Sequence, residues 1–400
     1  MALLKRKILP AILEYLPKEQ IIFLIGPRQV GKTSILKLIQ AEIVNKKIEF
    51  LSFNLEDKDH LDEFNESPKN LIKAIKENYS LSNTNKIIVF IDEIQYLKDP
   101  SNFLKYIYDE YKDQIKLIVS GSSSFYLDSK FRDSLSGRKI IFEIKSLDFE
   151  EFLNFRNQIK ILKALDNINQ ATKATQDQYH DLVNEFMVYG GYPAVVLENK
   201  PEIKKQLLAD YVNSYLKKDI LENNIKHLDK LYKLMALLAR YTGSLINKNE
   251  LATTLSLSAS TVDDYLLFLN KTFIISMAKP FYKNLRKELT KMPKAFFLDL
   301  GIRNYLIGDF NSPELRNDKG ELWENFYFKL ISDKYPKEDI KFWRTQDEQE
   351  IDFVIERQKI AIEIKSNPLR RTKIPKLFQE AYPEFTTDVL YGMIDIARFF

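Results

Sequence analysis

The chain of 400 residues contains no cysteine and only three histidines. The absence of cysteine excludes disulfide bonds and thiolate-ligated metal sites, and it is typical of proteins that work in a reducing compartment. His180 and His227 have no neighbouring residues that would complete a ligand set. We therefore interpret both as ordinary polar or packed side chains rather than as ligands or bases.

The sequence also lacks a hydrophobic run of the roughly 20 residues that a membrane-spanning helix needs. The amino-terminal segment, MALLKRKILPAILEYL, is too charged and too short for such a helix, and it has no small-residue cleavage site. We therefore expect a cytoplasmic protein that does not contact a membrane.

Neither sign of charge is in large excess, because 60 Lys+Arg stand against 56 Asp+Glu and the net charge is only +4. Any nucleic-acid surface must therefore be local. A hydrophobic content of 45% and a charged content of 29% are typical of a globular protein. At roughly 150 residues per domain, this length predicts two to three domains.

The strongest motif is a glycine-rich loop after an apolar stretch. Residues 21–25 (IIFLI) have the composition of a buried strand, and residues 26–33 (GPRQVGKT) match G-x-x-x-x-G-K-[ST]. Such a P-loop surrounds phosphate oxygens with backbone N–H groups and a helix N-terminus. We expect Lys32 to contact the β- and γ-phosphates of ATP and Thr33 to hold Mg²⁺. The alternative is a plain turn between a strand and a helix. The predicted nucleotide-binding residues are Gly26, Pro27, Arg28, Gln29, Val30, Gly31, Lys32, Thr33 and Ser34.

Two acidic residues follow a second apolar run, KIIVFIDE. Consecutive apolar positions are typical of a parallel strand buried on both faces. At its carboxyl end, Asp92 is expected to hold the magnesium through its water ligands. Glu93 is expected to polarise the water that attacks the γ-phosphate.

Two further residues are candidates for contact with the transferred phosphate. Ser120, with Ser122 beside it, follows a third apolar run and would bridge the γ-phosphate and the attacking water; the alternative is a solvated serine turn. Arg138, or with less support Arg132, would stabilise charge on the phosphate, within the chain or across a subunit interface. The alternative is that both are ordinary surface arginines.

Together these motifs resemble the AAA+-type ATPases of bacteria and archaea that carry a C-terminal domain of unknown function. The resemblance rests on the P-loop, FNLED, FIDEIQYL, VSGSS and LSGRKIIFEIKSLDFEEFL, and it extends to GGYPAVV at 190–196 and SYLKKDILE at 214–222. It implies a protein whose conformational changes are driven by ATP, and it does not identify a substrate. We expect the ATPase core to span residues 1–146.

Apolar residues three and four apart predict helices from 147 to 230, which we interpret as a lid that closes over ATP. Residues 231–292 then predict helix, helix, short turn, helix and strand, which is the order of a winged helix-turn-helix. Ser260 and Thr261, just after Ser258, lie at the start of the third helix, where contacts to DNA are expected.

The charges of this region favour DNA only in part. Asp263 and Asp264 on the third helix would repel phosphates, whereas the following segment is basic. Aromatic residues Phe281 and Tyr282 lie within that segment. The alternative is a winged helix that binds protein. The basic residues of the segment are Lys279, Lys283, Arg286, Lys287, Lys291 and Lys294, against one acid, Glu288.

The final segment, residues 293–400, resembles the PD-(D/E)xK nuclease fold in its order of elements. Glu363 and Lys365 alternate along one strand and so share a face, and Asp352 on the preceding strand can lie beside them. Two such carboxylates can hold Mg²⁺, which acidifies a water, while Lys365 would position that water. Glu324, on the preceding helix, would be an outer ligand.

Three alternatives to a working nuclease site stay open. Glu363 and Lys365 can simply pair on a solvent-facing strand, the fold can be retained without activity, or the pattern can arise by chance. The sequence thus predicts an α/β protein with a P-loop AAA+-type sheet, a helical lid, a winged helix and a restriction-endonuclease-like α/β domain. We expect an ATPase that acts on or binds double-stranded DNA; the alternative is an ATP-controlled switch that docks a protein partner.

Overall fold

The computed structural model describes residues 4–79, 86–121, 135–222, 227–282, 291–366, 373–393 and 395–399, and for 215–222 it describes the backbone alone. The chain divides into two compact units. The N-terminal unit comprises Met1–Lys145 with Lys271–Phe273, and the C-terminal unit comprises Ser146–Asn270 with Ile274–Phe400. Among the described helices, none is long and apolar enough to cross a membrane.

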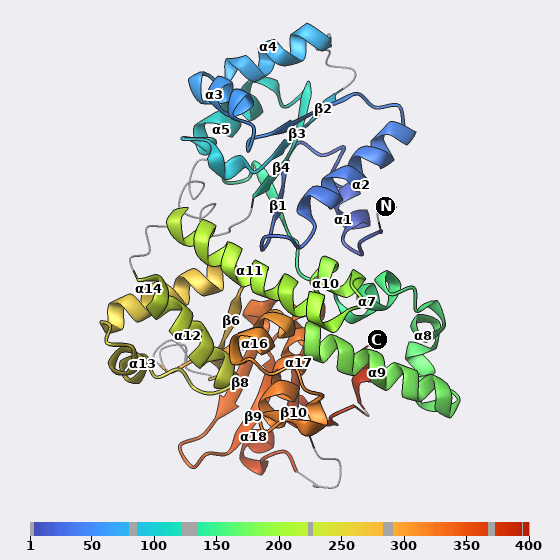
Figure 1. Ribbon diagram of the computed structural model, residues 1–400, viewed down its shortest axis with the longest axis vertical. Helices are drawn as coiled ribbons and strands as arrows, with labels where there is room; N and C mark the ends of the chain where they lie inside the picture. Colours follow the sequence, from blue (N-terminus) through green and yellow to red (C-terminus); the bar gives the residue numbers. More distant parts are fainter. Residues whose placement is uncertain are drawn as a thin grey trace. The chain divides into compact units, whose positions relative to one another are not determined.

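The N-terminal unit is built on a five-stranded parallel sheet of order β2-β3-β4-β1-β5 (Figure 1). Every residue of the inner strands β1, β3 and β4 is buried, as the apolar runs of the sequence predict. The strands are β1 (Ile21–Ile25), β2 (Phe50–Asn54), β3 (Ile87–Asp92), β4 (Ile115–Gly121) and β5 (Lys139–Glu143). The helices are α1 (Leu9–Leu13), α2 (Lys32–Asn45), α3 (Lys58–Glu66), α4 (Lys69–Asn78) and α5 (Pro100–Tyr111).

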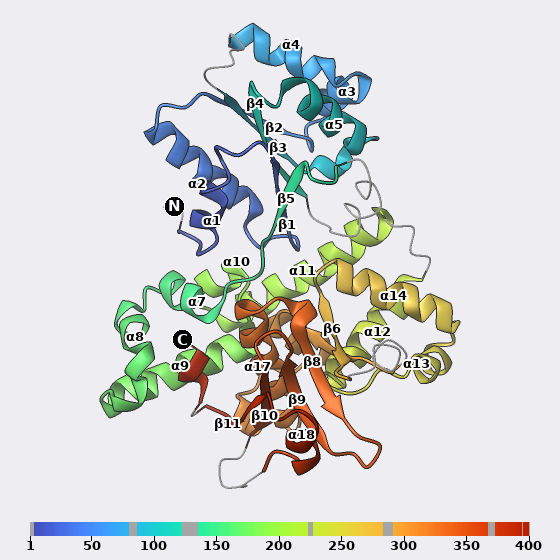
Figure 2. The ribbon, with the colours of Figure 1, turned by 180° about the vertical axis from the view of Figure 1, so that it is seen from behind.

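The C-terminal unit contains a mixed six-stranded sheet of order β11-β10-β9-β8-β6-β7 (Figure 2). The strands are β6 (Ile275–Pro280), β7 (Lys294–Phe297), β8 (Ile340–Arg344), β9 (Glu350–Ile355), β10 (Ile360–Lys365) and β11 (Thr386–Tyr391). The helices are α7 (Phe149–Phe155), α8 (Ile159–Ala164), α9 (Lys173–Tyr189), α10 (Pro193–Leu197), α11 (Pro201–Glu222), α12 (Leu228–Arg240), α13 (Lys248–Leu255), α14 (Ala259–Lys271), α16 (Leu300–Ile307), α17 (Lys319–Lys334) and α18 (Lys376–Ala381).

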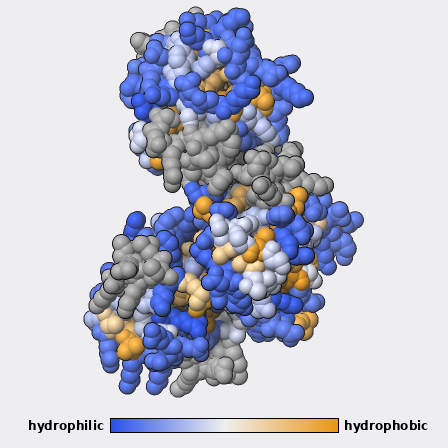
Figure 3. Space-filling model, turned by 90° about the vertical axis from the view of Figure 1, so that its left-hand side faces the viewer, coloured by the Kyte–Doolittle hydropathy of each residue, from blue (hydrophilic) through white to orange (hydrophobic). Residues whose placement is uncertain are grey.

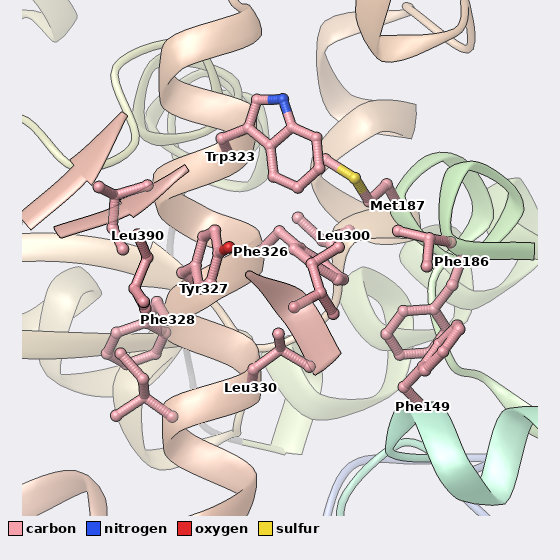
Figure 4. Packing of buried hydrophobic residues seen from close by; sticks show 14 of the residues in the cluster. Phe149, Phe186, Met187, Leu300, Trp323, Phe326, Tyr327, Phe328, Leu330 and Leu390 are labelled. Atoms are coloured by element: carbon pink, nitrogen blue, oxygen red, sulfur yellow. The ribbon is translucent and has the colours of Figure 1, made fainter. Parts of the chain in front are cut away.

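The helices expected to form an ATPase lid belong to the core of the C-terminal unit. Phe149 of α7 and Phe186 of α9 lie in one buried cluster with Phe326 of α17, and the Phe186 and Phe326 ring centroids are 6.3 Å apart (Figure 4). Residues 147–230 therefore share a core with the C-terminal sheet instead of forming a domain of their own, and their role as a lid stays a prediction. Helical periodicity shows that a face is buried, but it does not show which residues cover that face.

The predicted boundary between residues 292 and 293 is also wrong, because it separates two hydrogen-bonded strands. β7 pairs antiparallel with β6, with Ile275 opposite Phe297, and β6 pairs in parallel with β8. Residues 231–292 and 293–400 therefore share one sheet. Strand order depends on long-range pairing, which a local pattern of turns does not reveal.

The GGYP turn predicted between helices is held by Asp299, at the start of α16. Oδ2 of Asp299 accepts a hydrogen bond from Gly191 N at 2.8 Å, and Oδ1 accepts one from Gly301 N at 2.9 Å. Gly190 has φ +74°, and a Cβ on Gly191 would lie 2.4 Å from the carbonyl oxygen of Leu147. Glycine is therefore required at both positions, for conformation at the first and for space at the second.

The exposed large hydrophobic side chains of the described residues lie on different elements. The most exposed are Leu315 at 78%, Tyr241 at 63% and Val44 at 58%. Figure 3 shows hydrophobic side chains in small groups separated by hydrophilic ones on the face that it draws. Isolated exposed side chains of this kind are normal for a protein surface and identify no binding site by themselves.

Candidate functional site

The P-loop connects β1 to α2 and takes its shape from two glycines. The backbone of Gly26 packs against Ile144, so closely that a Cβ on Gly26 would lie 2.1 Å from the Ile144 carbonyl oxygen. Gly31 has φ +96°, a conformation that other residues rarely adopt, and α2 begins at the next residue. The loop therefore ends at a helix N-terminus, where N–H groups without partners in the helix favour an anion.

The side chain of Lys32 turns back into the loop. It is only 5% exposed, and Nζ donates hydrogen bonds to the carbonyl oxygens of Gly26 at 2.9 Å and Pro27 at 2.8 Å. The ammonium group thus lies inside the curl of backbone that the sequence motif assigns to phosphate. Phosphate oxygens can replace these two carbonyl oxygens as acceptors, and they form stronger, charge-assisted hydrogen bonds with the Lys32 ammonium.

Three predicted residues meet at the carboxyl ends of β3 and β4 and the start of α2. Thr33 Oγ1 donates a hydrogen bond to Asp92 Oδ2 at 2.8 Å, and the Ser120 hydroxyl donates to Asp92 Oδ1. The hydroxyl and carboxylate oxygens of Thr33 and Asp92 are the donors that Mg²⁺ prefers, so these residues fit the ion that a P-loop uses. Ser120 is fully buried and orients Asp92.

Glu93 occupies a strained backbone position next to Asp92. Its φ is +58°, in the left-handed region, and its N–H donates to the Ser120 hydroxyl at 3.3 Å. The amide nitrogen of Gln95 donates a hydrogen bond to the Glu93 carboxylate. Non-glycine residues in this conformation are often found at functional sites, where the surrounding structure holds them. Gln95 was not among the residues predicted from the sequence, although it is a polar residue that follows closely on Asp92 and Glu93.

Arg6 is a second residue of the site that was not predicted from the sequence. Its side chain is 8% exposed, and its guanidinium donates hydrogen bonds to the carbonyl oxygens of Val30 in the P-loop and Lys145 after β5, both at 2.9 Å. Arg6 therefore ties the P-loop to the segment that follows the sheet. No local pattern marks this residue, because Lys145 lies 139 residues away in the chain.

Arg138 is not placed to reach a phosphate bound to the P-loop of its own chain. Its carbonyl oxygen accepts a hydrogen bond from Ile21 N, at the start of β1, whereas the P-loop follows the other end of that strand. A five-residue strand spans about 15 Å. The Arg138 side chain pairs with Asp109 at 2.8 Å. The prediction of a role within the chain is corrected; action across a subunit interface stays a prediction. Ser122 and Arg132 lie outside the described residues.

The predicted metal ligands of the C-terminal segment do come together, on one face of the sheet. The antiparallel register of β9 and β10, extended by one pair, places Asp352 opposite Glu363, and Asp352 Oδ2 accepts a hydrogen bond from Ile364 N at 2.7 Å. Lys365 forms an ion pair with Glu363. Glu324 of α17 joins the group through a residue that the metal-site prediction did not include: Lys294 Nζ lies 2.9 Å from Glu324 Oε1 and also pairs with Glu350.

Burial controls the ionisation of this cluster. It raises the pKa of Glu324 to about 8, against the attraction of Lys294, and it raises the pKa of Glu363 to about 7, with the Asp352 carboxylate adding to the shift. Burial also raises the pKa of Asp352, again against Lys294. Burial alone would lower the pKa of Lys294, but Glu324, Asp352 and Glu350 more than offset this and raise it.

These residues do not fit a divalent metal ion, which corrects the prediction of a metal site. Among the described residues, no group of three or more histidine, aspartate or glutamate side chains is arranged to hold one. Glu324 is engaged by Lys294, and one oxygen of Glu363 is engaged by Lys365. The other oxygen of Glu363, Oε2, is buried and has no hydrogen-bond partner among the described residues. Lys294, which the sequence reading counted in a basic surface segment, is only 3% exposed.

Comparisons with known protein families match separate ranges in the N-terminal and C-terminal parts of the chain. Residues 18–153 match the family described as "AAA domain". Residues 180–312 and 319–394 match two domains of unknown function, DUF8612 and DUF4143. The range 180–312 crosses both predicted boundaries, at 230/231 and 292/293, in agreement with the shared sheet of the C-terminal unit.

Individual relatives match over most of the chain. An uncharacterized protein of Methanocaldococcus jannaschii, MJ1544, is 25% identical over 379 residues, covering 91% of this chain and 79% of its own. An uncharacterized protein of Haemophilus influenzae is 25% identical over 359 residues, covering 86% and 82%.

Among solved structures, the Walker-type ATPase PABY2304 of Pyrococcus abyssi is 14% identical. The match covers 76% of this chain and 95% of that one, with a TM-score of 0.44, which is too low to carry an argument about function. The assignment therefore rests on the family match together with the geometry of Lys32, Thr33 and Asp92. Residues 18–153 are therefore similar to the AAA-domain family, and they contain a P-loop on a parallel α/β sheet.

Proposed function

We propose that the protein binds ATP and hydrolyses it with Mg²⁺. The observation that carries this proposal is the 2.8 Å hydrogen bond between Thr33 and Asp92, which brings the two magnesium-site residues together beside the Lys32 ammonium. Bound Mg²⁺ would neutralise charge on the phosphates.

Each residue then has a distinct part in the reaction. Lys32 binds the β- and γ-phosphates, and Thr33 and Asp92 hold the ion. Ser120 keeps Asp92 in its orientation. Glu93 accepts a hydrogen bond from the attacking water and so orients it toward the γ-phosphate.

The magnesium assignment can be tested with Thr33→Val, which removes the hydroxyl and keeps the side-chain shape. We expect ATP turnover at limiting Mg²⁺ to fall at least about 10-fold, because the ion has one ligand fewer, and to recover partly as Mg²⁺ is raised. The measurement is steady-state phosphate release as a function of Mg²⁺ concentration. The matched control is Thr253→Val on α13 in the C-terminal unit, which should leave turnover unchanged. Equal magnesium dependence in both variants would remove Thr33 from the site.

We further propose that the C-terminal unit binds double-stranded DNA through a winged helix. The order α12, α13, α14, β6, β7 supports this arrangement, with β6 and β7 as the antiparallel wing strands. Ser258 Oγ accepts a hydrogen bond from Thr261 N at 3.0 Å and so caps α14. Ser260 is exposed at that end of the helix, whereas the Thr261 hydroxyl is hydrogen-bonded to Ser258 at 2.8 Å.

The charges around α14 support the DNA proposal more than the sequence suggested. Lys248 of α13 forms an ion pair with Asp263, which offsets one of the two carboxylates that would repel phosphates. Lys279 and Lys291 are exposed at the two ends of the segment that links the wing strands. Lys283, Arg286 and Lys287 lie outside the described residues.

The DNA proposal is tested by the salt dependence of binding to a fluorescent duplex. We expect binding at low salt. In the double variant Lys279→Gln/Lys291→Gln, the slope of log K against log salt should be smaller by about two, one for each phosphate that a lysine no longer neutralises. The control is Lys46→Gln/Lys47→Gln in the N-terminal unit, with the same change in charge. If the wild type does not bind duplex at low salt, the DNA proposal fails.

The competing proposal is an ATP-controlled switch that docks a protein partner and cuts no nucleic acid. The observation that favours it is the ion pair between Lys294 and Glu324, because a predicted nuclease ligand is thereby engaged inside the protein. Lys365, expected to position a water, is likewise paired with Glu363.

A further inference from the structure

A buried lysine lies among the carboxylates of the C-terminal unit. Lys294, the first residue of β7, is only 3% exposed. Its ammonium lies 2.9 Å from Glu324 of α17, pairs with Glu350 of β9, and lies 5.3 Å from the centre of the Phe342 ring on β8. Residues from three other elements, α17, β9 and β8, thus converge on the Lys294 ammonium.

The balance of charge in this cluster depends on that lysine. The carboxylates are Glu324, Glu350, Asp352 and Glu363, and the cations paired with them are Lys294, Lys365 and Arg344, the last at 3.0 Å from Glu350. Removing a buried charge from water costs several kcal/mol unless an opposite charge is close. With Lys294 the four carboxylates face three cations; without it they would face only two, and the cluster would need another cation.

The space around Glu324 is also closed on its second oxygen. Gly243, with φ +77°, packs so closely that a Cβ there would lie 2.6 Å from Oε2 of Glu324. The Gly243 N–H donates a hydrogen bond to the Ala295 carbonyl at 3.0 Å, which holds this backbone segment next to β7. Glu324 thus has the ammonium on one oxygen and packed backbone against the other.

We propose that Lys294 is a built-in cation that takes the place of a divalent metal ion, so that the carboxylate cluster of the wild-type protein holds no metal. The C-terminal unit then lacks the ion that a metal-dependent nuclease needs, and it serves as a binding module. Loss of the Lys294 charge frees Glu324 and Oε1 of Glu350, whose other oxygen stays paired with Arg344. These oxygens can then join Asp352 and the unpaired oxygen of Glu363 as ligands. The proposal does not depend on ATP hydrolysis by the N-terminal unit.

The test is a Mn²⁺ titration of the full chain without nucleotide, followed by electron paramagnetic resonance of free Mn²⁺. We expect the wild type to bind no Mn²⁺ more tightly than a Kd of about 1 mM. Lys294→Met, which keeps the length and removes the charge, is expected to gain one Mn²⁺ site at least about 10-fold tighter. That site should disappear in Lys294→Met/Glu363→Gln. The matched control is Lys341→Met on β8, which removes another buried lysine, 9% exposed and paired with Glu356, and should gain no site.

Two results would overturn the proposal. The first is stoichiometric Mn²⁺ binding by the wild type that is abolished in Asp352→Asn, which would make the cluster a metal site as it stands. The second is a folded Lys294→Met variant, with wild-type near-ultraviolet circular dichroism, that gains no Mn²⁺.

A measurement on the wild type alone covers the case in which Lys294→Met does not fold. A bound metal raises thermal stability in proportion to RT ln(1 + [L]/Kd). We expect the midpoint of the transition followed by tryptophan fluorescence to be the same in Mn²⁺ and in EDTA. A midpoint that rises with Mn²⁺ in the wild type but not in Asp352→Asn would refute the built-in cation.

Discussion

The variant Glu93→Gln is expected to bind ATP and to hydrolyse it at least about 100-fold more slowly than the wild type. Glutamine has the size of glutamate but cannot accept a proton from the attacking water or attract it with a full charge. The contacts that we propose for Lys32 and Thr33 with ATP do not involve Glu93, so the Kd for ATP should change by no more than about threefold. Single-turnover hydrolysis and equilibrium nucleotide binding, measured on the same preparation, separate the two effects.

The structure gives a reason to expect this large effect from Glu93 in particular. Its backbone is held in the left-handed region at φ +58°, which costs of order 1–2 kcal/mol for a non-glycine residue. The Ser120 hydroxyl accepts from its N–H, and Gln95 contacts its carboxylate. Backbone strain of this size is tolerated where the direction of the side chain matters for function.

Two controls bracket the Glu93 result. Lys32→Ala should lose ATP binding together with turnover, because the ammonium within the loop is the main cation on the phosphates. Glu63→Gln, on the exposed face of α3, should behave as wild type. If Glu93→Gln hydrolyses ATP as fast as Glu63→Gln does, Glu93 is not the residue that orients the water.

The variant Asp299→Asn is expected to destabilise the C-terminal unit by roughly 2–4 kcal/mol. The carboxylate accepts hydrogen bonds from three backbone N–H groups: Gly191 on Oδ2, and Gly301 and Ile302 on Oδ1. An amide has a single acceptor oxygen, so its NH₂ group would face either Gly191 or the start of α16. A buried N–H without an acceptor then accounts for most of the loss of stability.

Tryptophan fluorescence isolates this effect, because both tryptophans of the chain, Trp323 and Trp343, belong to the C-terminal unit. In urea, the tryptophan transition of Asp299→Asn should occur at a lower midpoint than in the wild type, with a similar slope. Asp181→Asn, at an exposed position of α9, is the matched control and should leave the midpoint unchanged. Equal midpoints for the two variants would show that Asp299 does not hold the GGYP turn.

The proximity of the P-loop to Asp92 could be predicted from the sequence because the geometry is largely local. The P-loop is a contiguous motif between a strand and a helix, and Asp92 ends a second recognisable buried strand. Carboxyl ends of parallel strands meet at one edge of a sheet, so these residues come together once the strands are known. The same reasoning failed for Arg138, because a short turn before β5 places it at the opposite edge of the same sheet.

The sequence by itself determined that this protein has a P-loop, a buried strand followed by Asp92-Glu93, and a C-terminal group of four charged residues on a helix and two strands. Only the tertiary structure decided that the helices after residue 146 belong to the C-terminal core, that Arg6 ties Val30 to Lys145, and that Asp299 holds a turn 108 residues earlier. It also decided that Lys294 lies buried between Glu324 and Glu350 instead of on a basic surface. The reason is physical: a motif reports which side chains a short segment carries, whereas burial and pairing depend on residues that folding brings from distant parts of the chain.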